Sequence, residues 1–205
     1  MREGVSLYGH VEVVCGPMFS GKTEELIRRM KRAEIARQRY QVFKPVIDDR
    51  YGKEFVASHN SNRMDAVPVG HSQQILELLE DTTRIVGIDE AQFFDQGLVE
   101  VVERLANRGI RVVCAGLDMD YQGRSFGPMG ELMAIAEDVK KLPAICVVCG
   151  APATRSQRVS ASSEQVLVGA HDSYEARCRA HHRPVAEDRR MQAPWLPTEA
   201  PQATN

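Results

Sequence analysis

The sequence has no long apolar run and no strong excess of charge. No stretch approaches the roughly 20 apolar residues of a membrane span, and the start, MREGVSLYGHVEVV, lacks the apolar centre of a secretory signal. The 26 Lys and Arg nearly balance the 28 Asp and Glu, which gives a formal charge of -2. No general basic field therefore draws the protein to nucleic acid or to an anionic membrane. We expect a cytoplasmic protein that recognises its partner at a local site.

Cysteine is also scarce, and its number is odd. The five cysteines do not suit a disulfide framework, and in a reducing compartment a CxxC pattern favours metal. Cys146 and Cys149 form such a pair, and after 28 intervening residues Cys178 and His181 repeat its spacing. Four ligands of this kind hold tetrahedral zinc with no open position, so we predict a structural zinc site. His182 adjoins His181 and can replace it as the fourth ligand.

Apolar periodicity alternates between strand and helix through much of the chain. Strand patterns occupy 10–15, 40–45, 84–89 and 110–118, and helical patterns occupy 23–39, 71–82 and 96–109. Strands that alternate with helices predict an α/β fold, in which helices cover both faces of a parallel sheet. Residues 48–64 are polar with no apolar period, which predicts a loop or flap.

The composition changes after residue 143, where cysteines, histidines and short β-like pieces such as EQVLVGA replace the alternating pattern. We predict an α/β nucleotide-binding domain over 1–143 and a small, ribbon-like zinc lobe over 144–186. The last stretch, 187–205, is polar and proline-rich, which predicts a disordered tail.

The segment GPMFSGKT matches the phosphate-loop pattern GxxxxGK[ST], and it lies between an apolar strand and an amphipathic helix, as that pattern requires. Glycines allow backbone N–H groups to surround phosphate oxygens, the lysine reaches the β and γ phosphates, and the hydroxyl residue can bind magnesium. We assign Gly16, Ser20, Gly21, Lys22 and Thr23 to an ATP and magnesium site.

Two adjacent carboxylates, Asp89 and Glu90, follow the strand RIVGI. Neighbouring side chains on a strand point to opposite faces, so the two acids are expected to have different roles. A phosphate loop also needs a carboxylate for its metal, which usually stands at the end of another strand. Asp89 is at such a position, so we prefer this role to the alternative that Asp89 only caps a helix. Glu90 can accept a proton, either from water in an ATPase or from a substrate alcohol in a kinase. The residues alone leave those two alternatives open.

The motifs together resemble one family, the type II thymidine kinases, which are zinc-containing cytosolic enzymes. The resemblance runs from about Gly9 to Arg183, through GPMFSGKT, DDRY, GIDEAQFF, LDMDYQGRSFG, KLPAIC, CVVCG, VGAHDSY and CRAHH. It implies a RecA-like parallel sheet with a zinc lobe. It also implies transfer of the γ-phosphate of ATP to the 5′-hydroxyl of thymidine, and of deoxyuridine, which gives thymidine monophosphate in nucleotide salvage.

The resemblance also implies individual roles. Glu90 matches the catalytic base of the family, and Asp48, Arg50 and Gln92 join the phosphate-loop residues and Asp89 around ATP and magnesium. The implied nucleoside pocket contains Met18, Phe93, Leu117, Tyr121, Phe126, Ser156, Val168, Gly169 and Tyr174.

Two of these pocket residues depart from the common family pattern. Tyr121 stands where many members carry Phe, and Ser156 stands where Thr is common. Both changes leave the preference between thymidine and deoxyuridine open.

The resemblance further implies a homotetramer and feedback inhibition by thymidine triphosphate, with ATP and thymidine as the partners. A rival interpretation is a phosphate-loop ATPase that acts on nucleic acid through the zinc module, supported by the basic run RRMKRAEIARQR. Such a run on a helix is usually a solvated face, and the chain lacks the interleaved aromatics of strand-binding proteins. A third interpretation, a zinc protein that binds nucleotide without turnover, gives Glu90 no role.

Overall fold

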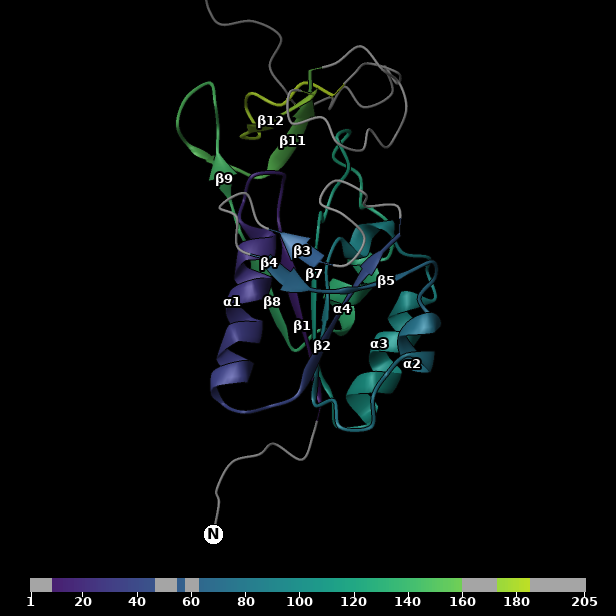
Figure 1. Cartoon of the computed structure of the whole chain (residues 1–205). Coiled ribbons are helices and arrows are strands. Elements are labelled where there is room, and N and C mark those ends of the chain that lie inside the picture. Colours follow the sequence, from purple (N-terminus) through teal and green to yellow (C-terminus); the bar gives the residue numbers. More distant parts are fainter. Residues whose placement is uncertain (1–8, 47–54, 58–62, 160–172, 185–205) are drawn as a thin grey trace, which may run out of the picture.

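The computed structural model describes residues 9–46, 55–57, 63–159 and 173–184. Its centre is a six-stranded sheet in the order β5-β2-β6-β7-β1-β8 (Figure 1). All neighbouring strands in this sheet run parallel. The strands are β1 (His10–Cys15), β2 (Tyr40–Pro45), β5 (Val67–Val69), β6 (Ile85–Ile88), β7 (Arg111–Gly116) and β8 (Asp138–Lys141). The α/β fold and the parallel sheet are confirmed.

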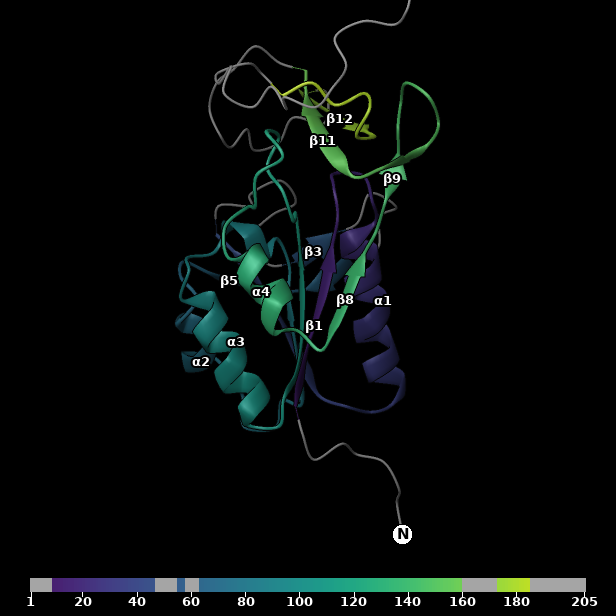
Figure 2. The ribbon, with the colours of Figure 1, turned by 180° about the vertical axis from the view of Figure 1, so that it is seen from behind.

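Helices cover both faces of this sheet, and each face has its own apolar core (Figure 2). Helix α1 (Lys22–Ile35) buries Leu26, Ile27 and Met30 against one face. Helices α3 (Leu98–Asn107) and α4 (Met129–Ile135) bury Leu98, Leu105 and Leu132 against the other. The apolar stripes at helical spacing therefore decide which side of each helix meets the sheet.

The structure differs from the sequence prediction in the short elements. The predicted helix over 71–82 is reduced to α2 (Gln74–Glu77), and Ser72 does not cap it, because Ser72 Oγ donates to Asp95 Oδ1 at 2.7 Å. Within the predicted loop over 48–64, β3 (Phe55–Ala57) begins a two-stranded antiparallel pair, which β4 (Arg63–Asp65) completes. Strand β8 and helix α4 were not predicted, and β8 has no apolar run because all four of its residues are exposed.

A buried ion network joins α1 to the sheet. Glu12 accepts hydrogen bonds from Arg29, from His10 at 2.8 Å and from Arg111 Nε at 2.5 Å. Burial would raise the pKa of the Glu12 carboxyl, but the hydrogen bond and charge of Arg111, together with His10 and Arg29, lower it to about 2. The carboxylate is thus charged and paired at neutral pH.

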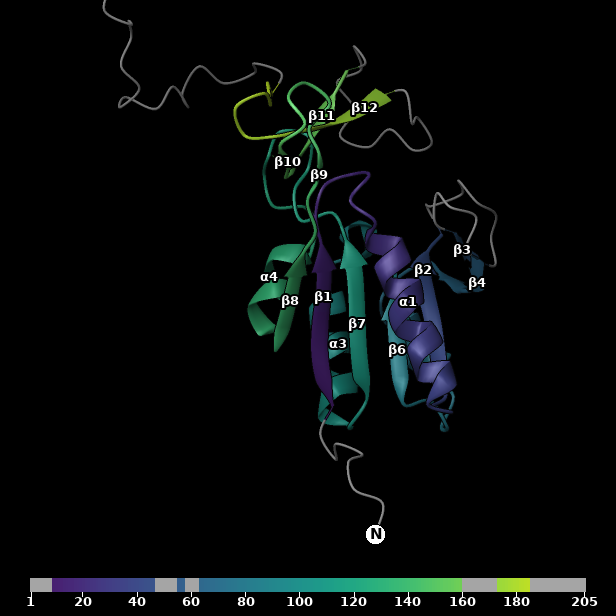
Figure 3. The same ribbon diagram turned by 90° about the vertical axis from the view of Figure 1, so that its left-hand side faces the viewer.

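A small lobe lies beyond the carboxyl ends of the sheet strands (Figures 1 and 3). It contains β9 (Ala144–Ile145) paired with β10 (Pro152–Ala153), and β11 (Arg155–Arg158) paired with β12 (Tyr174–Arg177). Among its described residues, the buried apolar cluster has four small members, Ala144, Cys146, Ala153 and Ala176. These four residues are too few to stabilise a lobe by themselves.

In the described part of the chain, no helix has both the length and the apolar character that crossing a membrane requires.

Candidate functional site

The glycine loop connects β1 to α1 at the carboxyl edge of the sheet. Gly16 has a φ of +147°, and a Cβ on it would lie 2.2 Å from the carbonyl oxygen of Leu142. Gly21, which precedes α1, has a φ of +81°. Side chains at these two positions would therefore clash or strain the backbone, which explains why the motif requires glycine there.

Two polar side chains of the loop turn back onto it. Ser20 Oγ and Lys22 Nζ each donate to the carbonyl oxygen of Pro17 at 2.8 Å. The first backbone bond of α1 runs from the Glu25 N–H to the Gly21 carbonyl at 3.0 Å. The lysine amine is consequently held close to the loop backbone, at the amino end of a helix.

Thr23 and Asp89 meet beside this loop. The Thr23 hydroxyl lies 3.3 and 3.2 Å from the two carboxylate oxygens of Asp89, which is 6% exposed. The Asp89 N–H donates to the Phe43 carbonyl at 2.9 Å, so the acid continues the sheet pairing beyond the end of β6. Hydroxyl and carboxylate oxygens at this spacing are the donors that magnesium prefers. The pair predicted from two distant motifs does come together.

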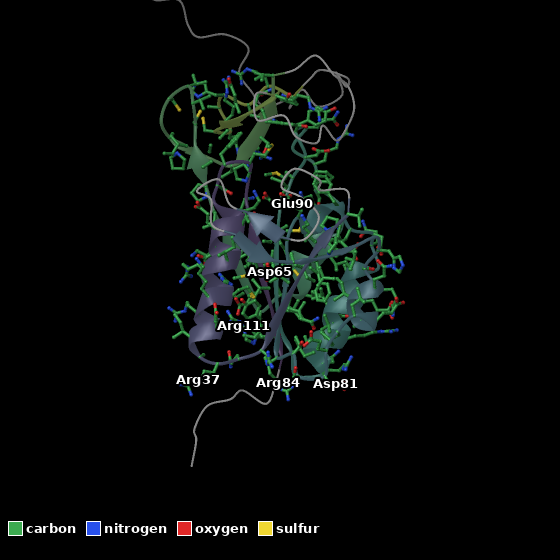
Figure 4. The ribbon with its side chains drawn as sticks, in the orientation of Figure 1. Arg37, Asp65, Asp81, Arg84, Glu90 and Arg111 are labelled. Atoms are coloured by element: carbon green, nitrogen blue, oxygen red, sulfur yellow. The ribbon has the colours of Figure 1, made fainter. Side chains whose placement is uncertain are left out.

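Glu90 leaves the strand direction by a sharp turn. Its φ of 50° and ψ of 41° are left-handed, which a residue with a Cβ seldom adopts, and it begins the 3₁₀ turn η1 (Ala91–Phe93). Figure 4 shows Glu90 at the end of the sheet that lies below the small lobe, whereas Arg37 and Arg84 lie at the opposite end. Strained backbone of this kind is frequent at functional sites.

Gln92 lies next to Glu90 and is 2% exposed. Its Nε2 donates to Glu90 Oε2 at 2.5 Å, and its Oε1 accepts the Leu117 N–H at 2.9 Å. Gln92 is predicted from the resemblance to lie around ATP and magnesium, and that role stays a prediction. Its hydrogen bonds join the strand-end acid Glu90 to the end of β7.

Aromatic residues of the predicted nucleoside pocket come from two segments of the sheet domain. The rings of Phe93 and Phe126 meet edge to face with centroids 5.5 Å apart. Leu117 follows β7 directly, and Tyr121 is buried in the loop after it. The structure therefore brings the GIDEAQFF and LDMDYQGRSFG segments together.

Arg158 is a buried residue of this region that the sequence analysis missed. Its guanidinium lies 3.9 Å from the centroid of the Tyr121 ring and 5.1 Å from that of Tyr174, and its Nε donates to the Tyr174 hydroxyl at 3.1 Å. A cation over two tyrosine rings stabilises both of them. Arg158 lies in the short polar strand RSQR, whose pattern carries no sign of burial.

Ser156 links the lobe to the glycine loop. Its Oγ accepts the Met18 N–H at 3.0 Å, and the side chain is buried. In the sequence, Ser156 differs from the common family threonine by the methyl group that it lacks. The structure adds a contact of its hydroxyl that joins two predicted pocket residues.

The Cys and His pairs predicted as metal ligands form one cluster. The ligand atoms of Cys146, Cys149, Cys178 and His181 all lie within 4.8 Å of one another, so they can hold a metal such as zinc. Burial would raise the pKa of the Cys146 thiol, but backbone N–H groups of Cys178 and Val148, with further hydrogen bonds from Cys149, lower it to about 5. The thiolate, which is the form that binds metal, is favoured at neutral pH.

His182, the alternative fourth ligand, has another partner. Its Nε2 lies 2.9 Å from the carbonyl oxygen of Tyr121, which can only accept, so this nitrogen carries the proton. Burial, opposed by this hydrogen bond, lowers the pKa of the ring. The cluster therefore uses His181, and His182 joins the lobe to the loop after β7.

Four predicted site residues, Asp48, Arg50, Val168 and Gly169, lie outside the described residues. The loop EQVLVGA lies outside them as well.

The sheet, the glycine loop and the Cys3His lobe place the chain among α/β enzymes that carry a metal-binding lobe. A family model described as thymidine kinase matches residues 9–182. The chain is also similar to a thymidine kinase of Bdellovibrio bacteriovorus, with 58% identity over 179 residues that cover 87% of this chain and 88% of that protein. The chain belongs to the thymidine kinase family, and the predicted resemblance is confirmed.

Proposed function

We propose that this enzyme transfers the γ-phosphate of ATP to the 5′-hydroxyl of thymidine, and of deoxyuridine, in nucleotide salvage. The observation that carries the proposal is the position of Glu90. It adjoins Asp89, which meets Thr23 of the glycine loop, and Gln92 connects it to the end of β7 and the aromatic segment that follows. A carboxylate between a phosphate site and a nucleoside pocket is where a kinase needs its base.

Glu90 acts as the base in this proposal. A primary alcohol is a weak acid, so a carboxylate within hydrogen-bond reach takes its proton as charge develops on the 5′ oxygen. That oxygen forms a bond to the γ phosphorus while the bond from the γ phosphorus to the β–γ bridging oxygen breaks, and ADP leaves. Lys22 and the loop N–H groups stabilise the negative charge on the transferring group.

Thr23 and Asp89 are the residues that would hold magnesium. A bound magnesium ion would neutralise phosphate charge and orient the phosphates for the transfer. The phosphate-loop pattern adds Gly16, Ser20 and Gly21 to the proposed ATP site, and the family resemblance adds Asp48, Arg50 and Gln92.

The proposed nucleoside pocket spans the sheet domain and the lobe. Met18, Phe93, Leu117, Tyr121 and Phe126 come from the sheet domain, and the lobe adds Ser156 and Tyr174. Val168 and Gly169, from the loop that the family uses to close over the base, complete it. Closure over a phosphoryl donor excludes water and so limits hydrolysis of ATP.

The Cys3His cluster has a structural role in this proposal. Four protein ligands leave no position for substrate, and zinc suits three thiolates with one imidazole. From the resemblance we also propose a cytoplasmic homotetramer, feedback inhibition by thymidine triphosphate, and domain limits at about residues 143 and 186.

The test is a panel of nucleosides with ATP, assayed for phosphorylated product, on the wild type and on Glu90→Gln. We expect thymidine-dependent release of ADP in the wild type. In the variant we expect turnover to fall by at least about 100-fold with little change in ATP affinity, because the base is lost and its shape is kept. Glu100→Gln, at an exposed glutamate on α3, is the matched control and should keep wild-type turnover.

The rival functions give different results in the same panel. An ATPase that acts on nucleic acid would release ADP when DNA is added and would ignore nucleosides. A binding protein would release ADP in neither case. Full turnover in Glu90→Gln would contradict the role of Glu90 as the base, but it would not affect the assignment of the chain to its family.

A further inference from the structure

A buried amide lies between the proposed base and the strand end that begins the nucleoside pocket. Gln92 is 2% exposed, and its two polar atoms contact two different segments, Glu90 after β6 and Leu117 after β7. In parallel sheets these two strand ends are neighbours, and β6 and β7 are paired here. The Gln92 side chain therefore spans the junction where phosphate chemistry and nucleoside binding meet.

The orientation of this amide follows from its partners. The Leu117 N–H can only donate, so the carbonyl oxygen of the amide must face it. The NH₂ group is then left to face Glu90, whose carboxylate oxygen accepts at 2.5 Å. A single rotamer of Gln92 satisfies both contacts, and reversing the amide would break both.

Two glycines make room for Gln92. A Cβ on Gly116 would lie 2.7 Å from Gln92 Oε1, and a Cβ on Gly127 would lie 2.2 Å from the Gln92 backbone oxygen. Gly127 also has a φ of +51°, which favours glycine independently. The end of β7 thus approaches the Gln92 amide closely, and the turn after Phe126 approaches its backbone, so both segments pack against this residue.

A buried hydrogen-bond partner limits the conformations that the Glu90 side chain can adopt. A glutamate side chain has several rotatable bonds, and holding it in one conformation costs entropy. Its backbone is already in a strained left-handed turn. A bond from a buried and fully determined amide restricts the carboxylate to one position.

We infer that Gln92 is a positioning residue, which holds the Glu90 carboxylate at a set place relative to the Leu117 end of the nucleoside pocket. This inference rests on the proposed function of Glu90 as the base. Gln92 itself transfers no proton and contacts no phosphate in this role. Misplacing a catalytic group by about 1 Å can cost about 100-fold in rate, so the effect should appear in kcat.

The experiment uses the full chain with two substitutions at one position. Gln92→Met keeps the length of the side chain and removes both polar contacts. Gln92→Glu keeps the acceptor for the Leu117 N–H and replaces the donor with a carboxylate that repels Glu90. We expect kcat to fall by about 100-fold in both variants with the KM for ATP unchanged, and we expect the thermal midpoint of Gln92→Glu to fall at least as far as that of Gln92→Met, because it buries a second carboxylate beside Glu90.

A double-mutant cycle separates positioning from general structural damage. Glu90→Ala removes the group that Gln92 holds, so adding Gln92→Met to it should lower the single-turnover rate by less than about twofold. If Gln92 is merely structural, the rate should fall by the same factor in both backgrounds, and that result would overturn the inference.

Gln41 provides the matched control. It also bridges separate groups, because its Oε1 accepts the Glu80 N–H at 2.9 Å and its Nε2 donates to the Leu78 carbonyl at 3.1 Å, but it lies on β2 away from the candidate site. Gln41→Met should keep wild-type kcat. If Glu90→Gln abolishes turnover while both Gln92 variants keep it, this inference alone fails; if Glu90→Gln keeps turnover, the proposed base fails first.

Discussion

The sheet domain and the metal lobe are stabilised by different means. Two apolar clusters cover the faces of the sheet, with large side chains such as Phe43, Leu26 and Met30 fully buried. Among the described residues of the lobe, the buried apolar cluster contains only alanines and Cys146, and Ile145 and Val147 are exposed. Burial of apolar area therefore stabilises the sheet domain more than the described part of the lobe, and we expect a metal at the Cys3His cluster to supply the difference.

Specific contacts connect the two regions in the described residues. Ser156 bonds to the loop at Met18, His182 bonds to the Tyr121 carbonyl, Arg155 donates to Met119 Sδ, and Arg158 stacks on the Tyr121 ring. Three of these contacts are hydrogen bonds, and the fourth is a cation over an aromatic ring. The relative position of the lobe and the sheet therefore depends on polar geometry, which a small number of substitutions can test.

Metal removal should have the largest effect and should separate the two regions. Cys149→Ser, or a strong chelator, should abolish amide protection over the described lobe and raise the KM for thymidine more than tenfold, because small metal domains gain about 10 kcal/mol from zinc. Hydrogen exchange would measure the loss of amide protection in the lobe, and the amide protection of β1 and β7 should not change. Normal thymidine binding in Cys149→Ser would contradict the proposal that the lobe closes the pocket.

A change in the ion network should act on the sheet domain and leave the lobe intact. Glu12→Gln should lower the free energy of unfolding by about 3 kcal/mol at pH 7, because Arg29 and Arg111 lose a buried charged partner. Metal content should stay at the wild-type level. Glu100→Gln, which breaks an exposed pair with Arg104, should cost less than about 1 kcal/mol.

The effect of Glu12→Gln on the free energy of unfolding should depend on pH. The folded pKa of Glu12 is about 2, below its ordinary value of 4.5, so the stabilisation is present above pH 4.5 and is lost as the pH falls toward 2. The difference in stability between wild type and Glu12→Gln should shrink over that window. A difference that stays constant from pH 5 to pH 2 would show that Glu12 contributes through shape and not through charge.

The smallest effect should come from the hydrogen bond between Ser156 of the lobe and Met18 of the glycine loop. Ser156→Ala leaves the Met18 N–H without its acceptor, which costs about 1 kcal/mol and should raise the KM for thymidine about fivefold. Ser156→Thr keeps the hydroxyl and should bind thymidine at least as well as the wild type. Steady-state kinetics with both variants decides between the hydroxyl and the missing methyl as the important feature.

Local motifs selected candidate site residues that the fold brings together, whereas the short elements were predicted less well. The glycine loop, the strand-end acids and the four Cys and His residues are local patterns whose chemistry requires particular residue types, so the sequence was enough to select them as candidates. Strand β8 was missed because its residues are exposed and show no apolar pattern. Helix α2 was predicted too long, because tertiary contacts such as that of Ser72 with Asp95 override the local helix propensity.

The sequence by itself determined the residue types at the candidate site and the family to which the chain belongs. Only the tertiary structure decided which partners those residues have. The hydrogen bond of His182 to the Tyr121 carbonyl leaves His181 as the fourth residue of the metal-binding cluster. The side chain of Gln92 bonds to Glu90 and reaches Leu117 because the fold places two strand ends side by side. The physical reason is that a motif specifies residues close in the chain, whereas hydrogen bonds form between residues that only packing brings together.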